Sequence, residues 1–145
     1  AECLGWSNAD ITRGINTATW PGRLERIGRF LLDGAHNVAA ARTLSAFLAE
    51  FHPEGVWMVF SAMRDKQYEE MLQLLRPHVR QFVFTKPQSS RAENPAELAK
   101  LCPGSHVESS AAAAIAHVRA NAPAGATVVI CGSLYLIGEV RSMLE

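Results

Sequence analysis

The chain has 145 residues, a length that suits one domain, and its composition is ordinary for a globular protein, with 48% hydrophobic and 19% charged residues. Fourteen basic residues balance fourteen acidic ones, so no excess of positive charge indicates a nucleic-acid or anionic-membrane partner. The apolar runs are too short to span a bilayer, no signal peptide is recognisable, and three widely spaced cysteines form no disulfide framework. We therefore expect a cytoplasmic protein.

The elements expected from the pattern of apolar residues are as follows. Residues 1–18 contain one short helix, over 11–15, and precede a turn at Trp20-Pro21-Gly22. After the turn we expect a hairpin or strand pair at 24–32, a helix at 38–51, a strand at 56–60, a helix at 66–75, a strand at 81–85, a short helix at 96–101, a short strand at 106–108, an Ala-rich helix ending at 122, a strand at 127–131 and a helix at 134–144.

The order of these elements predicts the fold class. Strands without a polar face alternate with amphipathic helices, which is typical of a mostly parallel sheet covered on both sides. Right-handed crossovers then give a Rossmann-like three-layer α/β sandwich. The carboxyl ends of parallel strands share one edge of the sheet, and α/β proteins place their sites there.

Polar or small residues follow three of the expected strands at this edge. They are Asp33 and His36 after 30–32, Ser61, Arg64 and Asp65 after 56–60, and Gly132, Ser133 and Tyr135 after 127–131. These segments, about a hundred residues apart in sequence, are therefore expected to converge in one crevice.

Each candidate residue has a functional and a structural interpretation. Asp33 is suited to bind a ribose or stay near a cation, or it is a turn or N-cap aspartate. His36 is suited to bind a carboxylate or phosphate, or it hydrogen-bonds locally at the helix start. Arg23, after a Pro-Gly turn, is suited to clamp a phosphate, or it is simply exposed. Asn37 favours the N-cap of the next helix.

Several kinds of site are not supported by the sequence. The Gly132-Ser133 junction is suited to an anion pocket made of backbone N–H groups, but neither GxxxxGK[ST] nor GxGxxG occurs. The five histidines are scattered without HExxH or Cys/His spacing, and GxSxG is absent. The sequence therefore predicts no metal site within the chain and no serine nucleophile.

Four motifs occur in a defined order: WPGRLE at 20–25, LLDGAHN at 31–37, DK at 65–66 and GSLYLIGEVR at 132–141. In this combination the chain resembles the C-terminal domain of folylpolyglutamate synthase and dihydrofolate synthase, within the Mur ligase superfamily. The resemblance covers nearly the whole chain, from 11 to 144.

The resemblance implies an ATP-dependent amide-forming ligase. In this family ATP phosphorylates a carboxylate of a folate or dihydropteroate compound, and the amine of L-glutamate then attacks the acyl phosphate. The Mg²⁺ ligands and most ATP contacts of the family belong to an N-terminal ATPase domain. Residues 1–18 would then be a linker or the tail of that domain, 19–145 the C-terminal domain, and the chain alone inactive.

The resemblance also implies roles for individual residues. Arg23 and Asp33 match the family's ATP contacts, His36 matches a histidine near the reacting groups, and Ser133 and Tyr135 match residues with a role in glutamate or interdomain contacts. We therefore predict His36, Ser133 and Tyr135 as catalytic.

Two alternative functions remain open. The chain would also suit another Mur-type amino-acid ligase, or a stand-alone nucleotide- or glutamate-binding module without catalysis. A domain separated from its partner is expected to expose an apolar patch, for which Trp6, Trp20 and Tyr135 are candidates.

Overall fold

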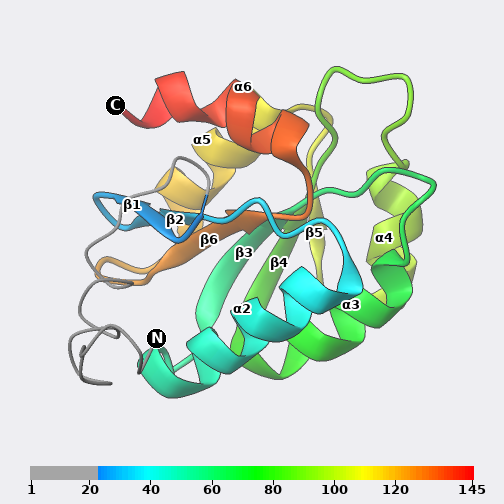
Figure 1. Ribbon diagram of the computed structural model, residues 1–145. Helices are drawn as coiled ribbons and strands as arrows, with labels where there is room; N and C mark the ends of the chain where they lie inside the picture. The colour runs from blue at the N-terminus through cyan, green and yellow to red at the C-terminus, as the bar shows by residue number, and fades with distance from the viewer. Residues whose placement is uncertain (1–22) are drawn as a thin grey trace, which may run out of the picture.

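The computed structural model describes residues 23–145 of the chain (Figure 1). In this part of the chain one sheet contains β1 (Glu25–Ile27), β2 (Phe30–Leu32), β3 (Val56–Phe60), β4 (Val79–Phe84), β5 (His106–Val107) and β6 (Val128–Cys131). The helices are α2 (Val38–Phe51), α3 (Tyr68–Leu75), the 3-10 turn η2 (Arg76–His78), α4 (Pro95–Leu101), α5 (Ala111–Asn121) and α6 (Leu134–Leu144). The predicted helix at 11–15, turn at 20–22 and boundary at 18/19 lie outside the described residues.

The strands follow the order β1-β2-β6-β3-β4-β5 across the sheet. The pairs β2–β6, β6–β3, β3–β4 and β4–β5 are parallel, and only β1–β2 is antiparallel. The strand that comes last in the chain therefore lies between β2 and β3. This arrangement confirms the predicted α/β class with a mostly parallel sheet.

A tight hairpin joins β1 to β2. Its two-residue turn begins with Gly28, whose φ of 59° is the positive value that hairpins of twisted strands favour. The second residue, Arg29, donates from its guanidinium to backbone carbonyls at the end of α5, those of Val118, Ala122 and Pro123. A cation at a helix C-terminus is favourable, so this side chain fastens the hairpin to α5.

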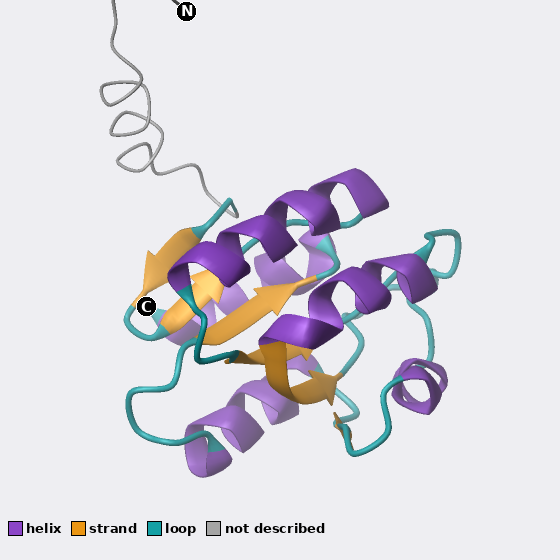
Figure 2. Ribbon diagram, turned by 90° about the horizontal axis from the view of Figure 1, so that it is seen from below, coloured by secondary structure: helices purple, strands orange, loops and turns teal. Residues whose placement is uncertain are grey.

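Both faces of the sheet carry a hydrophobic core. Successive residues of β6 alternate between the two, with Val129 and Cys131 in one core and Val128 and Ile130 in the other. The first core is closed by α2, α3 and α4, and the second by α5 and α6. Helices lie on both sides of the strands in Figure 2, which confirms the three-layer arrangement.

The ends of the elements agree with the sequence to within two residues. Asn37 caps α2 as predicted, since its side chain accepts from the Ala40 N–H at 2.8 Å. Ser110 caps α5 through the Ala113 N–H. The helix predicted from 66 begins at Tyr68, and the strand predicted from 81 begins at Val79. No helix within 23–145 is long and apolar enough to cross a membrane.

One ion pair connects the hairpin with the last helix. The guanidinium of Arg141, in α6, contacts both carboxylate oxygens of Glu25, in β1, at 2.7 Å. Such a two-point contact is the strongest geometry available to an arginine–carboxylate pair. It joins the WPGRLE and GSLYLIGEVR motifs, which lie at opposite ends of the sequence.

Candidate functional site

The loop that follows β2 is held by the carboxylate of Asp33. Its Oδ1 accepts the N–H of Ala35 at 2.9 Å, and its Oδ2 accepts the N–H of Leu24 at 3.2 Å. The first bond closes a local turn of the kind that aspartate favours. The second reaches the residue that precedes β1. Asp33 is thus a turn aspartate, while Asn37 takes the N-cap position.

The positive charge of Arg23 acts on this carboxylate. Burial raises the pKa of Asp33, while the hydrogen bonds from Ala35 and Leu24 and the positive charge of Arg23 act in the opposite direction. Leu24 has a φ of 46°, a left-handed conformation that costs leucine about 1–3 kcal/mol. The Asp33–Leu24 bond helps to hold this backbone, and it therefore helps to set the position of Arg23.

His36 is half-buried and oriented by its own loop. Its Nδ1 lies 2.7 Å from the carbonyl oxygen of Gly34. A carbonyl only accepts, so Nδ1 carries the hydrogen and Nε2 of the neutral ring has a free lone pair. Within 23–145 no hydrogen-bond partner of Nε2 is found, which leaves this nitrogen for a ligand.

The junction after β6 packs tightly against two neighbouring loops. Gly132 has a φ of 99°, and a Cβ at this position would overlap the carbonyl oxygen of Ser61 and lie 2.9 Å from the ring of Phe60. The N–H of Gly132 donates to the carbonyl of Ala35 at 2.9 Å. The predicted meeting of the loop after β2 with the loop after β6 is therefore seen in the structure.

Ser133 has a structural role at the start of α6. It is 2% exposed, and its Oγ accepts the N–H groups of Tyr135 and Leu136. Together with the Gly132 bond, this gives three backbone N–H groups of the junction partners inside the protein. The anion pocket expected here therefore has fewer free donors than the sequence suggests.

Two apolar side chains at the start of α6 are exposed. Leu134 is 58% exposed and Tyr135 54%. Tyr135 was predicted to belong to an exposed apolar patch, and its exposure is confirmed. Trp6 and Trp20 lie outside the described residues.

The segment after β3 bonds to the loop that follows β4, and not to the loop of Asp33. Arg64 donates from its guanidinium to the carbonyl of Ser90, and its N–H donates to the carbonyl of Arg91 at 2.9 Å. Asp65 pairs with Arg91 at 3.5 Å. Among the described residues no hydrogen bond or ion pair joins Arg64 or Asp65 to Asp33, His36 or Ser133. Of the three residues predicted after β3, only Ser61 contacts the junction, because its carbonyl oxygen lies against Gly132.

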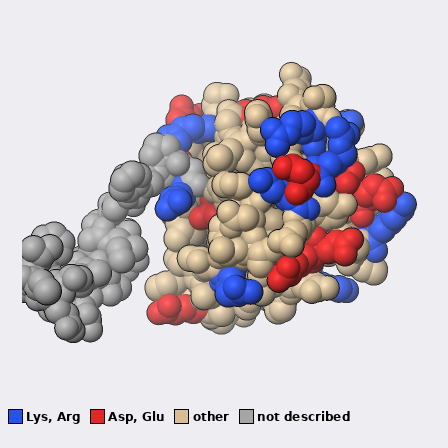
Figure 3. All heavy atoms as spheres, turned by 45° about the vertical axis from the view of Figure 1, so that its right-hand side comes forward, with Lys and Arg blue, Asp and Glu red and all other residues tan. Residues whose placement is uncertain are grey.

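Basic and acidic side chains are interleaved on the face of the molecule shown in Figure 3, in keeping with the balanced composition.

In the described part of the chain, the group of side chains close enough together to hold a metal ion is His106, Glu108 and His117. Within 23–145 it does not include Asp33.

The cluster of His106, Glu108 and His117 was not found from the sequence. The histidines stand eleven residues apart, a spacing that belongs to no metal-binding motif. The cluster exists only because the fold brings the His117 side chain of α5 to the His106 side chain of β5, and no signal within the sequence indicates that contact.

Comparison with known proteins decides the family. The family described as Mur ligase, glutamate ligase domain, matches residues 22–134. The chain belongs to this family. The matched stretch contains Arg23, Asp33, His36 and Ser133 and ends just before Tyr135, and it confirms the resemblance stated for the motifs.

Relatives of this glutamate ligase domain include two synthases. A probable bifunctional folylpolyglutamate synthase/dihydropteroate synthase of Haloferax volcanii is 36% identical over 140 aligned residues, covering 91% of this chain and 17% of that protein. The dihydrofolate synthase/folylpolyglutamate synthase of Bacillus subtilis is 30% identical over 146, covering 96% and 34%.

A solved structure gives the same result for the fold. The bifunctional folylpolyglutamate synthase/dihydrofolate synthase of Yersinia pestis, complexed with AMPPNP and Mn ion, matches with a TM-score of 0.81 and 25% identity, over 95% of this chain and 34% of that one. The chain thus spans about a third or less of the length of these relatives.

Proposed function

We propose that this glutamate ligase domain is the C-terminal part of an ATP-dependent ligase that adds L-glutamate to a carboxylate of a folate or dihydropteroate compound through an acyl phosphate. The names of the relatives support this activity, and the nucleotide analogue and Mn ion in the Yersinia pestis structure support ATP and a divalent cation. A preceding ATPase domain supplies the Mg²⁺ ligands and the remaining ATP contacts, and the enzyme works in the cytoplasm.

The observation that carries the proposal is the set of hydrogen bonds joining the two motif loops. Leu24 donates to Asp33, Ala35 donates to the same carboxylate, and Gly132 donates to the carbonyl of Ala35. These bonds fix the segment of Arg23, the loop of His36 and the start of α6 relative to one another. Groups held in this way stabilise developing charge without first having to reorganise.

Each side chain then has a defined task. Arg23 is exposed and lies next to a backbone that Asp33 holds, so its guanidinium can contact the charge of a transferring phosphoryl group. His36 presents Nε2 because Nδ1 donates to Gly34, so Nε2 can accept a proton or a hydrogen bond from the incoming amine. The Asp33 oxygens retain lone pairs for the nucleotide.

The first turn of α6 also has a task in the proposed ligase. Ser133 holds the first turn through its two N–H bonds, and the exposed Tyr135 and Leu134 lie on that turn. We assign this turn to contacts with glutamate or with the preceding domain, because a partner surface would cover its apolar side chains.

The proposal is tested first on the native gene product. An immunoblot of source cells is expected to give a band far above 15.8 kDa, and the purified product is expected to form ADP only when glutamate and a pteroate or folate acceptor are both present. The chain of 145 residues is expected to show no turnover alone. A native band at 15.8 kDa without ligase activity would leave the non-catalytic binding module as the better account.

The role of Arg23 is tested in the full-length enzyme. Arg23→Ala is expected to lower kcat/KM by about 2–4 kcal/mol of transition-state stabilisation, the effect of losing one preorganised donor. Arg42→Ala is the matched control, because Arg42 is an exposed arginine on α2. Equal values of kcat/KM for the two variants would show that Arg23 makes no contribution to catalysis.

The role of Asp33 is tested with asparagine. Asp33→Asn retains one acceptor oxygen for Ala35, but its NH₂ group then faces the N–H of Leu24, and two donors cannot bond each other. We expect the Arg23 segment to loosen, with a higher KM for ATP and a nearly unchanged melting temperature. An unchanged KM would show that the Leu24 bond does not position Arg23.

A further inference from the structure

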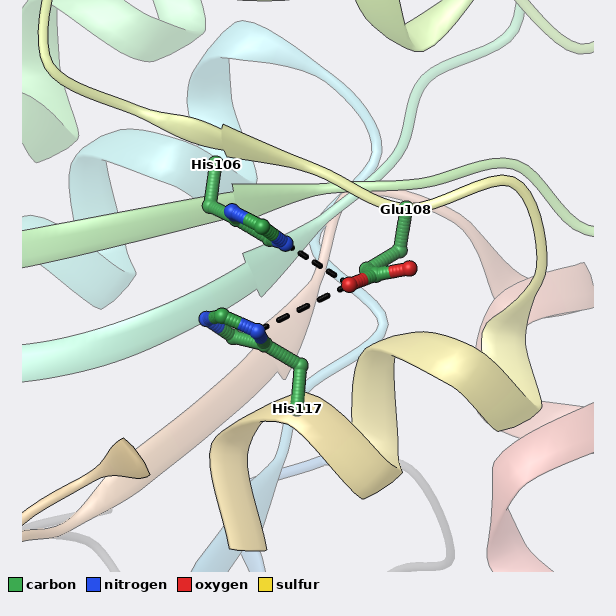
Figure 4. Close-up of side chains that lie close together, drawn as sticks. All are labelled: His106, Glu108 and His117. Atoms are coloured by element: carbon green, nitrogen blue, oxygen red, sulfur yellow. Dashed lines mark hydrogen bonds and ion pairs between the residues drawn. The ribbon is translucent and has the colours of Figure 1, made fainter. Parts of the chain in front are cut away.

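Three side chains meet between the edge strand β5 and helix α5. His106 lies in β5, Glu108 is the first residue after this strand, and His117 lies in α5. Figure 4 shows the three side chains directed toward one another. Nε2 of His106 is 2.7 Å from Oε1 of Glu108, and Nδ1 of His117 is 3.6 Å from the same oxygen. One ligand atom from each residue lies within 4.8 Å of the others.

The environment of this His106–Glu108–His117 cluster is partly open to solvent. The side chains of His106, Glu108 and His117 are 41%, 25% and 19% exposed. The two imidazole rings stack with centroids 3.7 Å apart and an angle of 11°. A single carboxylate thus faces two imidazoles, and stacked rings cannot both become cationic without strong repulsion.

We propose that His106, Glu108 and His117 form a binding site for Zn²⁺. Two imidazole nitrogens and one carboxylate are a donor set that zinc accepts, with water completing a tetrahedron. Mg²⁺ and Ca²⁺ prefer oxygen ligands throughout, so the two histidines select against them. The ion takes the place of the hydrogen between Nε2 of His106 and Oε1 of Glu108, that hydrogen moves to Nδ1 of the His106 ring, and the ion joins all three side chains.

Binding requires one local adjustment. An imidazole binds a metal along the lone pair in its own plane, and two rings stacked in parallel cannot both aim at one ion. One ring must therefore turn about its terminal torsion, which is soft for histidine. His106 is the ring that turns, because it is the most exposed of the three and lies on an edge strand.

Nδ1 of His117, the nitrogen that faces Glu108, has one further polar neighbour. The amide of Asn121 lies 3.4 Å from the same Nδ1 and moves aside with the ion.

The position of the cluster indicates what the ion would do. Strand β5 has two residues and pairs only with β4, so its attachment to the sheet is weak. A metal that bridges β5 and α5 fastens this strand at the end of the sheet opposite to β1 and β2. The inference therefore does not depend on the proposed ligase activity.

The test is a metal titration of the chain carrying Cys3→Ser, which removes a thiol that would compete. Co²⁺ is added first, because a tetrahedral Co²⁺ site gives visible d–d absorption, and Zn²⁺ is then used to displace it. We expect saturation at one ion per chain, with Zn²⁺ shifting the NMR signals of the His106 and His117 rings and raising the melting temperature.

Variants locate the ligands. Each of His106→Gln, Glu108→Gln and His117→Gln is expected to weaken Zn²⁺ binding at least 10-fold, since even loss of an outer-shell partner costs 10- to 100-fold. His78→Gln is the matched control, a histidine whose Nε2 contacts Ser45 and no carboxylate, and its affinity is expected to be unchanged.

The proposal is overturned by any of three results. These are no saturable binding to the parent chain, equal binding by Glu108→Gln and the parent, or loss of binding in the His78→Gln control. If a ligand variant fails to fold, the ring signals of the folded parent chain still decide, because unshifted His106 and His117 signals at saturating Zn²⁺ exclude the site.

Discussion

At Gly132 the backbone of the β6–α6 junction passes against the end of β3. The residue combines a φ of 99° with a position where a Cβ would overlap the Ser61 carbonyl. Gly132→Ala is therefore expected to lower the free energy of unfolding by about 2–4 kcal/mol, because the clash is with backbone that cannot move aside cheaply. Urea unfolding measures the change.

Gly138 provides the control for this prediction. It lies in the same motif, within α6, and a Cβ there would meet nothing within 4 Å. Gly138→Ala is expected to stabilise the chain by about 0.5–1 kcal/mol through helix propensity. Equal effects at the two glycines would contradict the close approach at Gly132.

Two buried hydroxyls at the ends of β3 and β4 have no partner within 23–145. The Oγ of Ser61 and the Oγ1 of Thr85 are buried and make no hydrogen bond with any described residue. Thr85→Val preserves the shape of the side chain and removes a polar group that burial penalises, so we expect a gain of about 1 kcal/mol. Ser110→Ala should have the opposite sign, because Ser110 caps α5. A destabilised Thr85→Val would reveal a partner for that hydroxyl.

Among the elements, β1 and α6 are joined by the Glu25–Arg141 pair. The Glu25 side chain is 13% exposed and that of Arg141 36%, so solvent screens the pair in part. We expect a double-mutant cycle of Glu25→Gln and Arg141→Met to give a coupling of about 1 kcal/mol, decreasing with added salt. Arg141→Lys should lose most of it, since lysine cannot make the two-point contact. Zero coupling at low salt would contradict a role in fastening the hairpin.

The elements themselves could largely be predicted from the sequence. Strand and helix periods are local signals, as are caps such as Asn37 and the turn at Gly28, and these placed most boundaries correctly. The family of the chain was also predicted from the motifs, which the domain match confirms. The starts of β4 and α3 differ from the predicted ones. Strand β4 begins earlier because Val79 pairs with Val56 of the neighbouring strand, and α3 begins later because a turn precedes Tyr68.

Contacts between elements could be predicted only in part: the meeting of the loops after β2 and β6 was expected, but the order of the strands was not. The sequence does not state that β6 lies between β2 and β3, and this order is what brings Gly132 against Ala35 and Ser61. The same reason explains Arg64 and Asp65, which bond to the loop after β4 and not to the loop of Asp33. It also explains why the histidines of β5 and α5 were taken as scattered.

For the whole molecule, two partly buried groups give opposite dependences of stability on pH. Burial raises the pKa of Asp33 above 3.8, so the folded chain holds this proton more tightly and stability falls as pH rises through that region. Desolvation and His106 lower the pKa of His117 below 6.5, so the unfolded chain takes this proton first. That contribution to stability is complete above pH 6.5 and is lost as pH falls.

Stability is therefore expected to decrease as pH falls below about 6.5 because of His117, and to decrease as pH rises above about 4 because of Asp33. Urea midpoints measured in metal-free buffer give the profile. His117→Gln should flatten the profile just below pH 6.5, while Asp33→Asn should flatten only the more acidic part. An unchanged slope in His117→Gln would show that this histidine titrates alike in the folded and unfolded chain.

The contact between Glu25 and Arg141 also indicates that the protein can be circularly permuted. Because residues 25 and 141 touch, a linker of about six Gly/Ser residues can join residue 145 to residue 23. New termini can then be opened between Ala124 and Gly125, two exposed residues of the surface turn before β6. Such a circular permutant keeps every strand neighbour while β6 becomes the first strand to be synthesised, and its native circular dichroism would show that the fold is independent of sequence order.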